Sequence, residues 1–388
     1  MSTEASGRRL VAVNHTGLLS GAEVVLLRVL EAACARGWSA SAAVPDGALV
    51  SELTGIGVPV EPIPDLMLPD GPRVVAAPRL AARTITAAAR IRAAAADADL
   101  VLAGGVRALP ALRVANVGAP VVWLAQGVLD RPRWRRLVAA CARSVDLAIA
   151  VSGAVADSID DRHFPVRVIW NGTRWPVDPA PPEPPSPPVI GCAAILTSWK
   201  GQHVLLDAVA RLEQRDVVVE LLGGTFPKDR SYVEALERRA AQPDLEGRVR
   251  FAGHVDDTLA RMRRWTVAVV PSVDPEAGPL SALEAMSVGV PLVASDHGGP
   301  PEILGAAGVL VPPGDPDTLA GALTLLLNDP DRRARCSAAG RRLVASGLTL
   351  DAQMDAVVNA LEEAARGTAL RTPWLSPPRQ LPVDPARW

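Results

Sequence analysis

The chain has 388 residues, which is long for a single hydrophobic core, so two domains are expected. Its 40 Lys and Arg residues nearly balance 42 Asp and Glu residues, and this excludes the strongly basic composition typical of a nucleic-acid-binding protein. Four cysteines lie far apart without zinc-ligand spacing, which indicates reduced thiols in a cytoplasmic protein. No apolar run approaches the length of a membrane-spanning helix.

The first half of the chain alternates short apolar strands with helical segments, a pattern typical of a parallel sheet covered by helices. A strand at residues 9–14 leads through the loop HTGLLSGAE into a helix with an apolar face. Further strands are expected at residues 39–44, 100–103, 121–125 and 147–151. We therefore predict a Rossmann-like N-terminal domain over residues 1–175.

Two arginine-rich stretches of this half allow two interpretations. Residues 73–96 are rich in alanine and arginine, and residues 131–136 place Trp134 among arginines. A solvated helix is the favoured interpretation of both stretches, and a face that contacts an acceptor or a membrane surface is the alternative. The triplet Asp97-Ala98-Asp99 resembles a metal-binding motif, but it directly precedes a strand and is interpreted as a turn.

A proline-rich segment, PVDPAPPEPPSPP at residues 176–188, separates the two halves. Such a sequence cannot form a helix or an interior strand, so it predicts a stiff extended linker and a domain boundary. Beyond it the strand and helix pattern resumes, and we predict a second Rossmann-like domain over residues 189–366 with an irregular tail at residues 367–388. Two such domains are expected to leave a cleft, the default place for a ligand. The expected strands of the second domain are 189–195, 217–222, 249–255, 267–271 and 291–295. The expected helices of the second domain are 200–215, 231–241, 256–265, 279–288, 315–328, 330–346 and 350–366.

Two carboxylates flank one predicted strand-to-helix loop of the second domain. Glu276 lies on the loop, and Glu284 lies inside a helix that is expected to begin near Pro279. The unpaired N–H groups and the positive dipole end of such a helix favour a phosphate. Carboxylates that accept hydrogen bonds on both sides of a phosphate site suit a molecule with hydroxyls at both ends of a diphosphate, such as a nucleotide sugar. The alternative is two solvated glutamates that the helix dipole favours.

Other polar residues and glycines also follow predicted strands. Lys200 stands at the end of the first strand of the second domain, where it can neutralise a diphosphate, although a lone lysine at a helix start is otherwise surface charge. Gly17 and Gly21 let the first strand-to-helix turn approach a phosphate or a sugar, and a plain turn is equally consistent with them. His15 and His297 also follow strands, without a Ser/His/Asp or Cys/His order.

Several long motifs together resemble glycosyltransferase family 4, a family of retaining enzymes with the GT-B fold and an E-x7-E motif. The resemblance is carried by PSVDPEAGPLSALEAMSVGVPLVASDHGGPPEIL, KGQHVLLDA, VRFAGHV and VLVPPGDPDTLAGAL in the second half, and by SGAE, LAIAVSGAV and VIWNG in the first. It implies an α/β GT-B fold with two Rossmann-like domains and a central cleft. It also implies transfer of a hexose from a nucleotide sugar, with UDP favoured over GDP, to a hydroxyl acceptor such as a secondary metabolite, a glycolipid or a polysaccharide precursor.

The resemblance also implies roles for single residues. Glu284 would accept hydrogen bonds from the ribose hydroxyls, Lys200 would stabilise the diphosphate leaving group, and Glu276 would hold the donor sugar. The other implied donor-binding positions are Gly21, Ala277, Gly278, Pro279 and Leu280, of which Pro279 offers no N–H. No metal or cofactor is implied, because a lysine and a helix terminus can neutralise the phosphates. The acceptor would contact the first domain, where Arg133 and Trp134 are candidates together with a weak peripheral membrane contact.

Two positions depart from the pattern of the family. Ala194-Ile195-Leu196 replaces a glycine-arginine-leucine run, so Lys200 lacks the usual second cation. Gln126 stands where a histidine is common, and its amide can bind a sugar hydroxyl but does not titrate. We take Lys200, Glu276 and Gln126 as catalytic candidates. Two alternatives stay open, a non-catalytic protein that binds nucleotide sugars and a sugar-nucleotide isomerase of the same fold.

Overall fold

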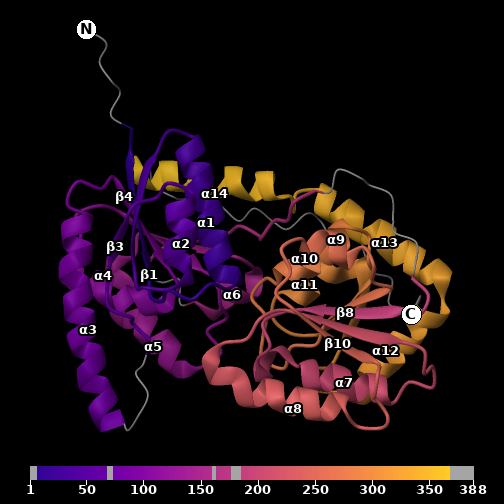
Figure 1. Ribbon diagram of the computed structural model, residues 1–388. Coiled ribbons are helices and arrows are strands. Elements are labelled where there is room, and N and C mark those ends of the chain that lie inside the picture. The colour runs from indigo at the N-terminus through magenta and orange to yellow at the C-terminus, as the bar shows by residue number, and fades with distance from the viewer. Residues whose placement is uncertain (1–6, 68–72, 160–162, 176–184, 368–388) are drawn as a thin grey trace. The chain divides into compact units, whose positions relative to one another are not determined.

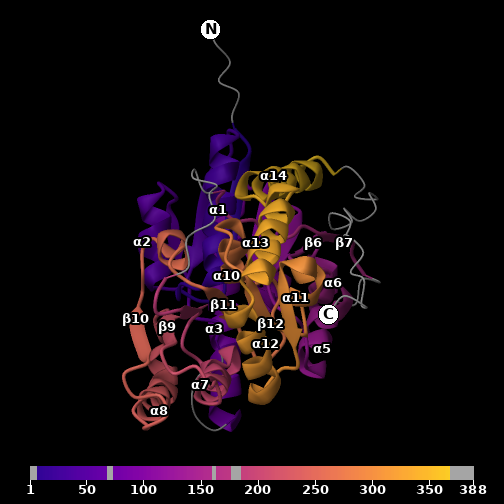
Figure 2. The ribbon, with the colours of Figure 1, turned by 90° about the vertical axis from the view of Figure 1, so that its right-hand side faces the viewer.

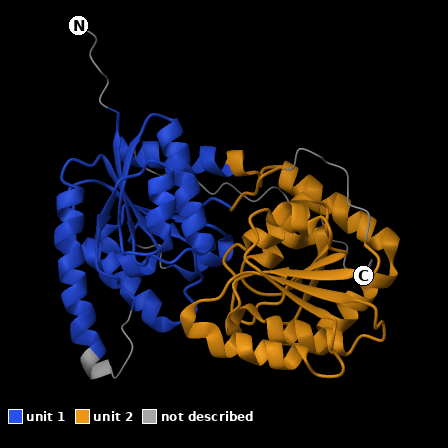
Figure 3. Cartoon of the chain, in the orientation of Figure 1, with its two compact units in different colours: residues 1–170, 353–375 blue, residues 171–352, 376–388 orange. Residues whose placement is uncertain are grey.

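The computed structural model describes residues 7–67, 73–159, 163–175 and 185–367, and the chain forms two compact units (Figure 3). Of the described residues, unit 1 contains those up to residue 170 and again those from 353 to 367, and unit 2 contains those between 171 and 352. The described part of the chain therefore passes from one unit to the other twice. Of the predicted linker, residues 176–184 lie outside the described residues, and so does the predicted tail from residue 368.

Unit 1 is built on a parallel sheet of seven described strands in the order β3-β2-β1-β4-β5-β6-β7 (Figure 1). The strands are β1 (Arg9–Asn14), β2 (Ser39–Val44), β3 (Val60–Pro62), β4 (Leu100–Gly104), β5 (Val121–Ala125), β6 (Leu147–Ala150) and β7 (Val166–Val168). The helices are α1 (Gly21–Ala35), α2 (Ala48–Gly55), α3 (Arg73–Ala94), α4 (Leu109–Ala115), α5 (Pro132–Cys141), α6 (Gly153–Ser158) and α14 (Leu350–Ala365), with short 3-10 turns η1 (Val106–Ala108) and η2 (Ala142–Ser144).

The sheet of unit 1 is covered by helices on both faces. Helices α1 and α2 lie on one side of the strands, and α3 and α4 lie on the other (Figure 1). Every residue of β4 and β5 is therefore buried, which explains why both strands consist of small and apolar residues. The chain runs outward from β1 to β2 and β3, and then crosses back to β4 on the other side of β1. In open parallel sheets ligands bind at the carboxyl ends of such a pair of strands.

Unit 2 repeats this design with a parallel sheet of six described strands in the order β10-β9-β8-β11-β12-β13. The strands are β8 (Val189–Ala193), β9 (Val218–Leu222), β10 (Val249–Gly253), β11 (Val267–Val270), β12 (Leu292–Ser295) and β13 (Gly308–Val311). The helices are α7 (Gln202–Ala210), α8 (Arg230–Ala240), α9 (Thr258–Met262), α10 (Leu280–Ser287), α11 (Pro300–Leu304), α12 (Pro316–Asn328) and α13 (Pro330–Ala345), with 3-10 turns η3 (Ser198–Lys200), η4 (Pro227–Asp229) and η5 (Gly305–Ala307).

The helices of unit 2 form two groups around this sheet. Helix α7 packs with α8 and α12, and helix α10 packs with α9 and α13, so the groups lie on opposite faces (Figure 1, Figure 2). The chain runs outward from β8 to β9 and β10, and then crosses back to β11 on the other side of β8, with β8 and β11 parallel. The carboxyl ends of these two strands are therefore the place where this sheet is expected to bind a ligand.

One face of the unit 2 sheet contains a buried charge. The strand register places Gly191, Glu220 and Arg250 side by side. A Cβ at Gly191 would lie 1.8 Å from the ring of Trp265, so only glycine lets this indole lie against β8. The Nε1 of Trp265 and the Nε of Arg261 donate hydrogen bonds to Glu220 at 2.8 Å and 2.9 Å. Burial alone would raise the pKa of Glu220, but these hydrogen bonds hold the pKa below its ordinary value.

The structure shortens two helices of unit 2: the one predicted over 256–265 is Thr258–Met262, and the one after β8 differs more. The sequence predicts a helix over residues 200–215, but the chain forms a 3-10 turn that ends at Lys200 and a shorter helix over Gln202–Ala210. Gly201 separates the two with a φ of 72°, and a Cβ there would lie 1.9 Å from the carbonyl oxygen of Pro271. The left-handed glycine lets the loops after β8 and β11 approach each other closely. Across the described ranges, no helix has both the length and the apolar composition that crossing a bilayer requires.

Candidate functional site

The loops after β8 and β11 bring two predicted site residues into direct contact. Lys200 ends the turn after β8, and Glu276 lies on the loop between β11 and α10. The Nζ of Lys200 lies 2.6 Å from Oε1 of Glu276, and their side chains are only 18% and 6% exposed. Residues that are 76 positions apart in the sequence thus form a largely buried ion pair at the carboxyl edge of the sheet.

The ammonium group of Lys200 has a second neighbour. Its Nζ lies 4.1 Å from the centroid of the Trp199 ring, which is the geometry of a cation–π interaction. An ammonium group carries three N–H donors, and Glu276 accepts from one of them. The aromatic ring and the carboxylate hold the positive charge in place while donor capacity is left for a ligand.

Glu276 is held through both its side chain and its backbone. The Oγ of Ser272 donates a hydrogen bond to Oε1 of Glu276 at 2.5 Å. The carbonyl oxygen of Glu276 accepts a hydrogen bond from the N–H of Gly299 at 2.8 Å. Gly298 has a φ of 68°, and a Cβ there would lie 2.1 Å from the same carbonyl oxygen. The loop after β12 therefore fits against the Glu276 backbone because residue 298 has no side chain.

His297 supports the same loop from β12. Its Nε2 lies 3.0 Å from the carbonyl oxygen of Ser272, and because a carbonyl can only accept, Nε2 donates. The buried Nδ1 of His297 has no hydrogen-bond partner among the described residues. In a neutral ring this atom is an acceptor, so it is available to a hydroxyl or N–H group of a ligand. In the sequence His297 is marked only by its position after a predicted strand, and no pattern marks Ser272.

Helix α10 begins beside Glu276 with an open N-terminus. The structure makes Pro279 the capping residue before Leu280, whereas the sequence predicts it in the first turn of the helix. A proline has no side-chain acceptor to cap the helix, so the first N–H groups of α10 can bind an anion. The Nδ2 of Asn171 donates to the carbonyl oxygen of Gly278 at 2.8 Å and holds the preceding loop. Glu284 is half-buried about one turn inside the helix.

Cys192 lies in β8 close to the ion pair. Burial raises the pKa of the Cys192 thiol to about 12, while Lys200 lowers this pKa and Glu276 raises it. The thiol is therefore protonated at neutral pH and is not a nucleophile. All four cysteines of the chain are free thiols.

The departure at residue 195 has a structural role of its own. The carbonyl oxygen of Ile195 accepts a hydrogen bond from Nε2 of Gln202 at 3.1 Å. The N–H of Leu196 donates to the carbonyl oxygen of Gly224 at 2.9 Å, which extends the pairing between β8 and β9 past the ends of both strands. Backbone hydrogen bonds thus hold the segment that leads from β8 to Lys200, although residue 195 supplies no second cation.

The other predicted site residues belong to unit 1. Gly21 is the first residue of α1, next to Ser20, whose N–H and Oγ donate to the buried carboxylate of Glu23 at 3.1 Å and 2.5 Å. The Nδ2 of Asn14 donates to the same carboxylate at 3.2 Å. Glu23 therefore fixes the loop between β1 and α1. A Cβ at Gly17 would lie 2.2 Å from the carbonyl oxygen of Asp46, so this glycine is required for packing of the turn.

Gln126 directly follows β5 in the same unit. Its Nε2 is buried and has no hydrogen-bond partner within the described part of the chain. A buried polar group without a partner is costly, so this amide is suited to donate to an oxygen of a ligand. Arg133 and Trp134 lie in the first turn of α5, and Trp134 also contacts Arg107, a residue that sequence reasoning missed. Its position directly after β4 was the available signal.

The structure shows no cluster of metal ligands in the parts of the chain that it describes. No group of three or more His, Cys, Asp and Glu residues in those ranges is placed to hold a metal ion. Asp99 instead accepts a hydrogen bond from the N–H of Arg9 at 2.7 Å, and Asp97 forms an ion pair with the Arg9 side chain at 3.2 Å. The Asp97-Ala98-Asp99 triplet thus serves the turn before β4, as predicted.

Two family models match consecutive parts of the chain. The model described as Glycosyltransferase Family 4 matches residues 19–174, and the model described as Glycosyl transferases group 1 matches residues 174–343. Among solved structures, HepE of Anabaena in complex with UDP and glucose has a TM-score of 0.77 at 24% identity, over 91% of this chain and 99% of that one. A sucrose-phosphate synthase of Thermosynechococcus elongatus has a TM-score of 0.75 at 18% identity, over 93% and 100% of the two chains. These likenesses confirm the predicted two-domain GT-B fold.

Two curated relatives illustrate the range of similar proteins. A GDP-mannose-dependent monoacylated alpha-(1-6)-phosphatidylinositol monomannoside mannosyltransferase of Corynebacterium glutamicum is 30% identical over 46% of this chain and 48% of its own length. The lipopolysaccharide core biosynthesis glycosyltransferase LpsE of Rhizobium meliloti is 29% identical over 56% of this chain and 65% of its own length. The chain thus spans about half to two thirds of the length of these relatives.

Proposed function

Because the chain belongs to the glycosyltransferases of group 1 and family 4, we propose that it transfers a hexosyl group from a nucleotide sugar to a hydroxyl group of an acceptor. The observation that carries this proposal is the ion pair between Lys200 and Glu276, at the carboxyl ends of β8 and β11 and beside the open N-terminus of α10. A cation, a carboxylate and the N-terminus of a helix at one place suit the leaving group and the sugar of such a donor.

In this proposal each residue has a distinct role. Lys200 and the first N–H groups of α10 stabilise the charge that develops on the diphosphate as the glycosidic bond breaks. Glu276 accepts from the sugar hydroxyls, as a carboxylate held by Ser272 can, and Glu284 accepts from the ribose hydroxyls. Ala277, Gly278 and Leu280 contribute loop backbone, and Gly21 and Gln126 are the contributions proposed for unit 1.

The proposed stereochemistry is retention. The acceptor hydroxyl attacks the face of the sugar from which the diphosphate departs, and a phosphate oxygen takes the proton of that hydroxyl. Lys200 and the helix terminus together supply the positive charge in a metal-independent reaction. The four free thiols support a cytoplasmic location as part of the same proposal.

The proposed donor is a UDP-hexose. Support comes from the similar fold of HepE, a protein whose solved structures contain UDP, glucose and UDP-glucose. GDP-mannose is the second candidate, because two curated relatives are named as GDP-mannose-dependent mannosyltransferases. The same relatives are named for phosphatidylinositol mannosides, which favours a glycolipid over a secondary metabolite or a polysaccharide precursor as the proposed acceptor class.

The test is nucleotide release from UDP-glucose and from GDP-mannose, measured with and without candidate acceptors. We expect release by the wild-type protein and a loss of about a hundredfold or more in Lys200→Ala and in Glu284→Ala, because each removes a group that contacts the donor. Exposed Lys228→Ala in the neighbouring turn η4 is the matched control and should keep wild-type release. Equal release by wild type and Glu284→Ala would contradict the proposal.

Two other outcomes identify the alternatives. If UDP or GDP raises the melting temperature but no acceptor supports turnover, the protein is a non-catalytic binder, a role for which Ile195 in place of a second cation is the motivating observation. If the sugar nucleotide is converted to an isomer without any acceptor, the protein is an isomerase of the same fold. NMR spectroscopy of the donor before and after incubation distinguishes these outcomes, because an isomer has the same mass as the donor but different sugar-proton signals.

A further inference from the structure

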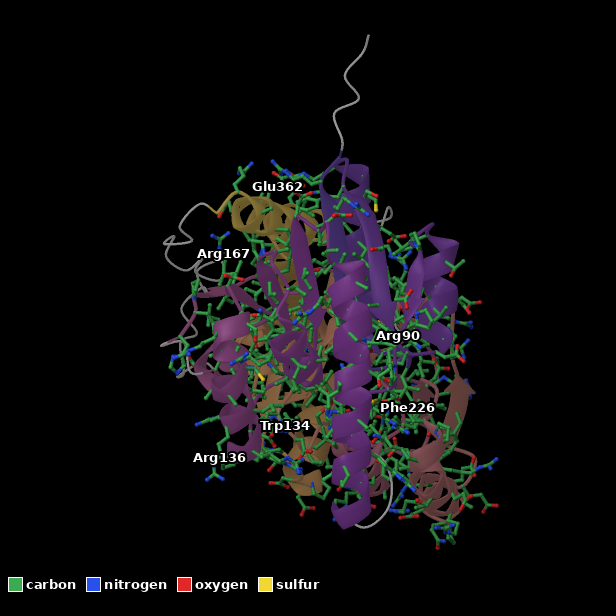
Figure 4. All side chains as sticks on the ribbon, turned by 90° about the vertical axis from the view of Figure 1, so that its left-hand side faces the viewer. Arg90, Trp134, Arg136, Arg167, Phe226 and Glu362 are labelled. Carbon is green, nitrogen blue, oxygen red and sulfur yellow. The ribbon has the colours of Figure 1, made fainter. Side chains whose placement is uncertain are left out.

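An arginine–tryptophan cluster, formed by Arg107, Arg133 and Trp134, lies in the segments that follow strands β4 and β5 of unit 1. Arg107 belongs to η1, directly after β4, and the other two residues belong to the first turn of α5. The guanidinium carbons of Arg107 and Arg133 each lie 5.0 Å from the centroid of the Trp134 ring. Figure 4 draws the labelled side chains Trp134 and Arg136 on the same side of α3. One indole thus contacts two cations.

The two guanidinium groups form no ion pair with any described carboxylate. Burial lowers the pKa of Arg107, and the positive charge of Arg133 lowers this pKa further, whereas Asp65 opposes the shift. Across the described ranges, neither Arg107 nor Arg133 has a carboxylate within ion-pairing distance. An arginine stays protonated in proteins, so the cluster holds two positive charges without an ion-pair partner among the described residues, and Asp65 acts on Arg107 only from a longer distance.

Arg107 also donates a hydrogen bond to a weak acceptor. Its Nη1 donates to the Sδ of Met67 at 2.9 Å, and a thioether sulfur accepts poorly. A guanidinium group has five N–H donors in a planar fork that matches the oxygens of a phosphate or carboxylate. A charged oxygen acceptor would therefore be a stronger partner for this half-buried side chain than any that the folded unit offers it.

The start of α5 adds to the positive potential. The positive dipole end of a helix normally favours acidic residues, but the first turn of this ten-residue helix contains none. Arg131 precedes it, and its ion pair with Asp130, at 3.6 Å, is exposed and hence weak. A bound anion would relieve the mutual repulsion of the two arginines and the helix end, because the first turn of α5 supplies no carboxylate.

We propose that the arginine–tryptophan cluster binds a phosphate group of the acceptor, a proposal that rests on the function proposed above. Arg107 and Arg133 contact the phosphate oxygens, and Trp134 holds the two guanidinium groups in a fixed arrangement. The phosphate belongs either to a soluble phosphorylated saccharide or to the headgroup of an acceptor lipid. The cluster thereby selects anionic acceptors over neutral ones of the same size.

The decisive variant is Arg133→Glu, because Arg133 is exposed and its replacement leaves the core intact. Arg107→Gln is a second variant, checked for folding by circular dichroism because Arg107 is half-buried. The matched control is Arg113→Glu on α4, an exposed arginine outside the cluster. Binding is measured by calorimetry with glycerol 3-phosphate against glycerol. It is also measured by co-sedimentation with phosphatidylglycerol vesicles against phosphatidylcholine vesicles.

We expect the wild type to bind at least one phosphate probe and neither neutral one. We expect Arg133→Glu to weaken binding by about tenfold or more, and Arg113→Glu to change it by less than about threefold. Binding of glycerol 3-phosphate assigns the site to a soluble phosphate ester, and binding of phosphatidylglycerol vesicles alone assigns it to a lipid headgroup. Equal binding by wild type and Arg133→Glu, or no preference for the charged probes, would overturn the proposal.

The donor assay keeps the two proposals apart. Nucleotide binding depends on Lys200 and Glu284, so Arg133→Glu should show the same stabilisation by UDP or GDP as the wild type. If no nucleotide binds but the phosphate probes do, the proposed function fails and the cluster is still an anion site. If nucleotide release proceeds and every phosphate probe fails, the cluster proposal alone is refuted.

Discussion

Gly298→Ala tests whether the position of Glu276 depends on the loop after β12. The new Cβ would stand 2.1 Å from the carbonyl oxygen of Glu276, whereas non-bonded carbon and oxygen atoms need about 3.5 Å. One of the two loops must therefore move by more than about 1 Å. Glu276 is held on this side by the Gly299 hydrogen bond, so its carboxylate would shift relative to Lys200.

The expected loss follows from that displacement. A misplacement of about 1 Å at a reacting centre costs about a hundredfold in rate. We therefore expect nucleotide release by Gly298→Ala to fall by about that factor. An alanine with a positive φ also costs about 1–2 kcal/mol of stability, which must be separated from the effect on the site.

Gly314→Ala separates the two effects. Gly314 has a φ of 73°, close to the 68° of Gly298, but a Cβ there meets nothing within 4 Å. Both variants should lose stability through backbone strain, and Gly298→Ala should lose more because of its clash with Glu276, as urea unfolding can measure. Only Gly298→Ala should also lose nucleotide release. If Gly298→Ala releases nucleotide as fast as Gly314→Ala, the positioning role inferred for this loop is refuted.

Three further predictions concern the ion pair and the core of unit 2. Lys200→Arg keeps the charge but replaces the compact ammonium at Glu276, and we expect nucleotide release to fall by about tenfold or more while unfolding by urea is little changed. Glu220→Gln should lower the free energy of unfolding by about 1–3 kcal/mol at neutral pH, because Glu220 accepts hydrogen bonds from charged Arg261 and from Trp265. Since the pKa of Glu220 is lowered, this contribution is present above the unfolded-chain pKa of about 4.3 and is lost as the pH falls through the lower folded pKa, so the two unfolding curves should converge in acid. Gly191→Ala puts a Cβ 1.8 Å from the Trp265 ring and should destabilise the fold by several kcal/mol, and a melting temperature equal to that of the wild type would contradict the packing described.

The sequence was sufficient to predict the layered fold. Strands at residues 9–14, 39–44 and 121–125 have the predicted bounds, because parallel strands buried on both faces are short apolar runs. The predicted bounds of the helix over residues 200–215 were wrong, and its start could not be predicted, since the need for a glycine at residue 201 comes from a loop that lies 70 residues further along the chain. The candidate site shows the same division between local pattern and tertiary contact. Glu276 and Lys200 could be selected by their positions after strands, but Ser272 and His297 act through tertiary contacts that no local pattern predicts.

Arg107 shows the same limit in unit 1. Its neighbours in the sequence, Val106 and Ala108, give no sign of a charged site. Its significance comes from Trp134 and Arg133, which a different strand-to-helix connection brings beside it. An arginine after a strand end can be noted from sequence, but a pair of charges without an ion-pair partner among the described residues can be recognised only in the folded unit.

The return of the chain to unit 1 at helix α14 has a consequence for protein engineering. The side chains of Arg36 and Arg167 form ion pairs with Glu362 and Glu363 of α14, and Val358 of that helix is fully buried. A fragment that stops at residue 170 would expose this apolar surface and leave both arginines without these partners. Chimeras that exchange unit 2 between relatives should therefore replace residues 171–352 as an insert and keep both flanking segments from the same parent.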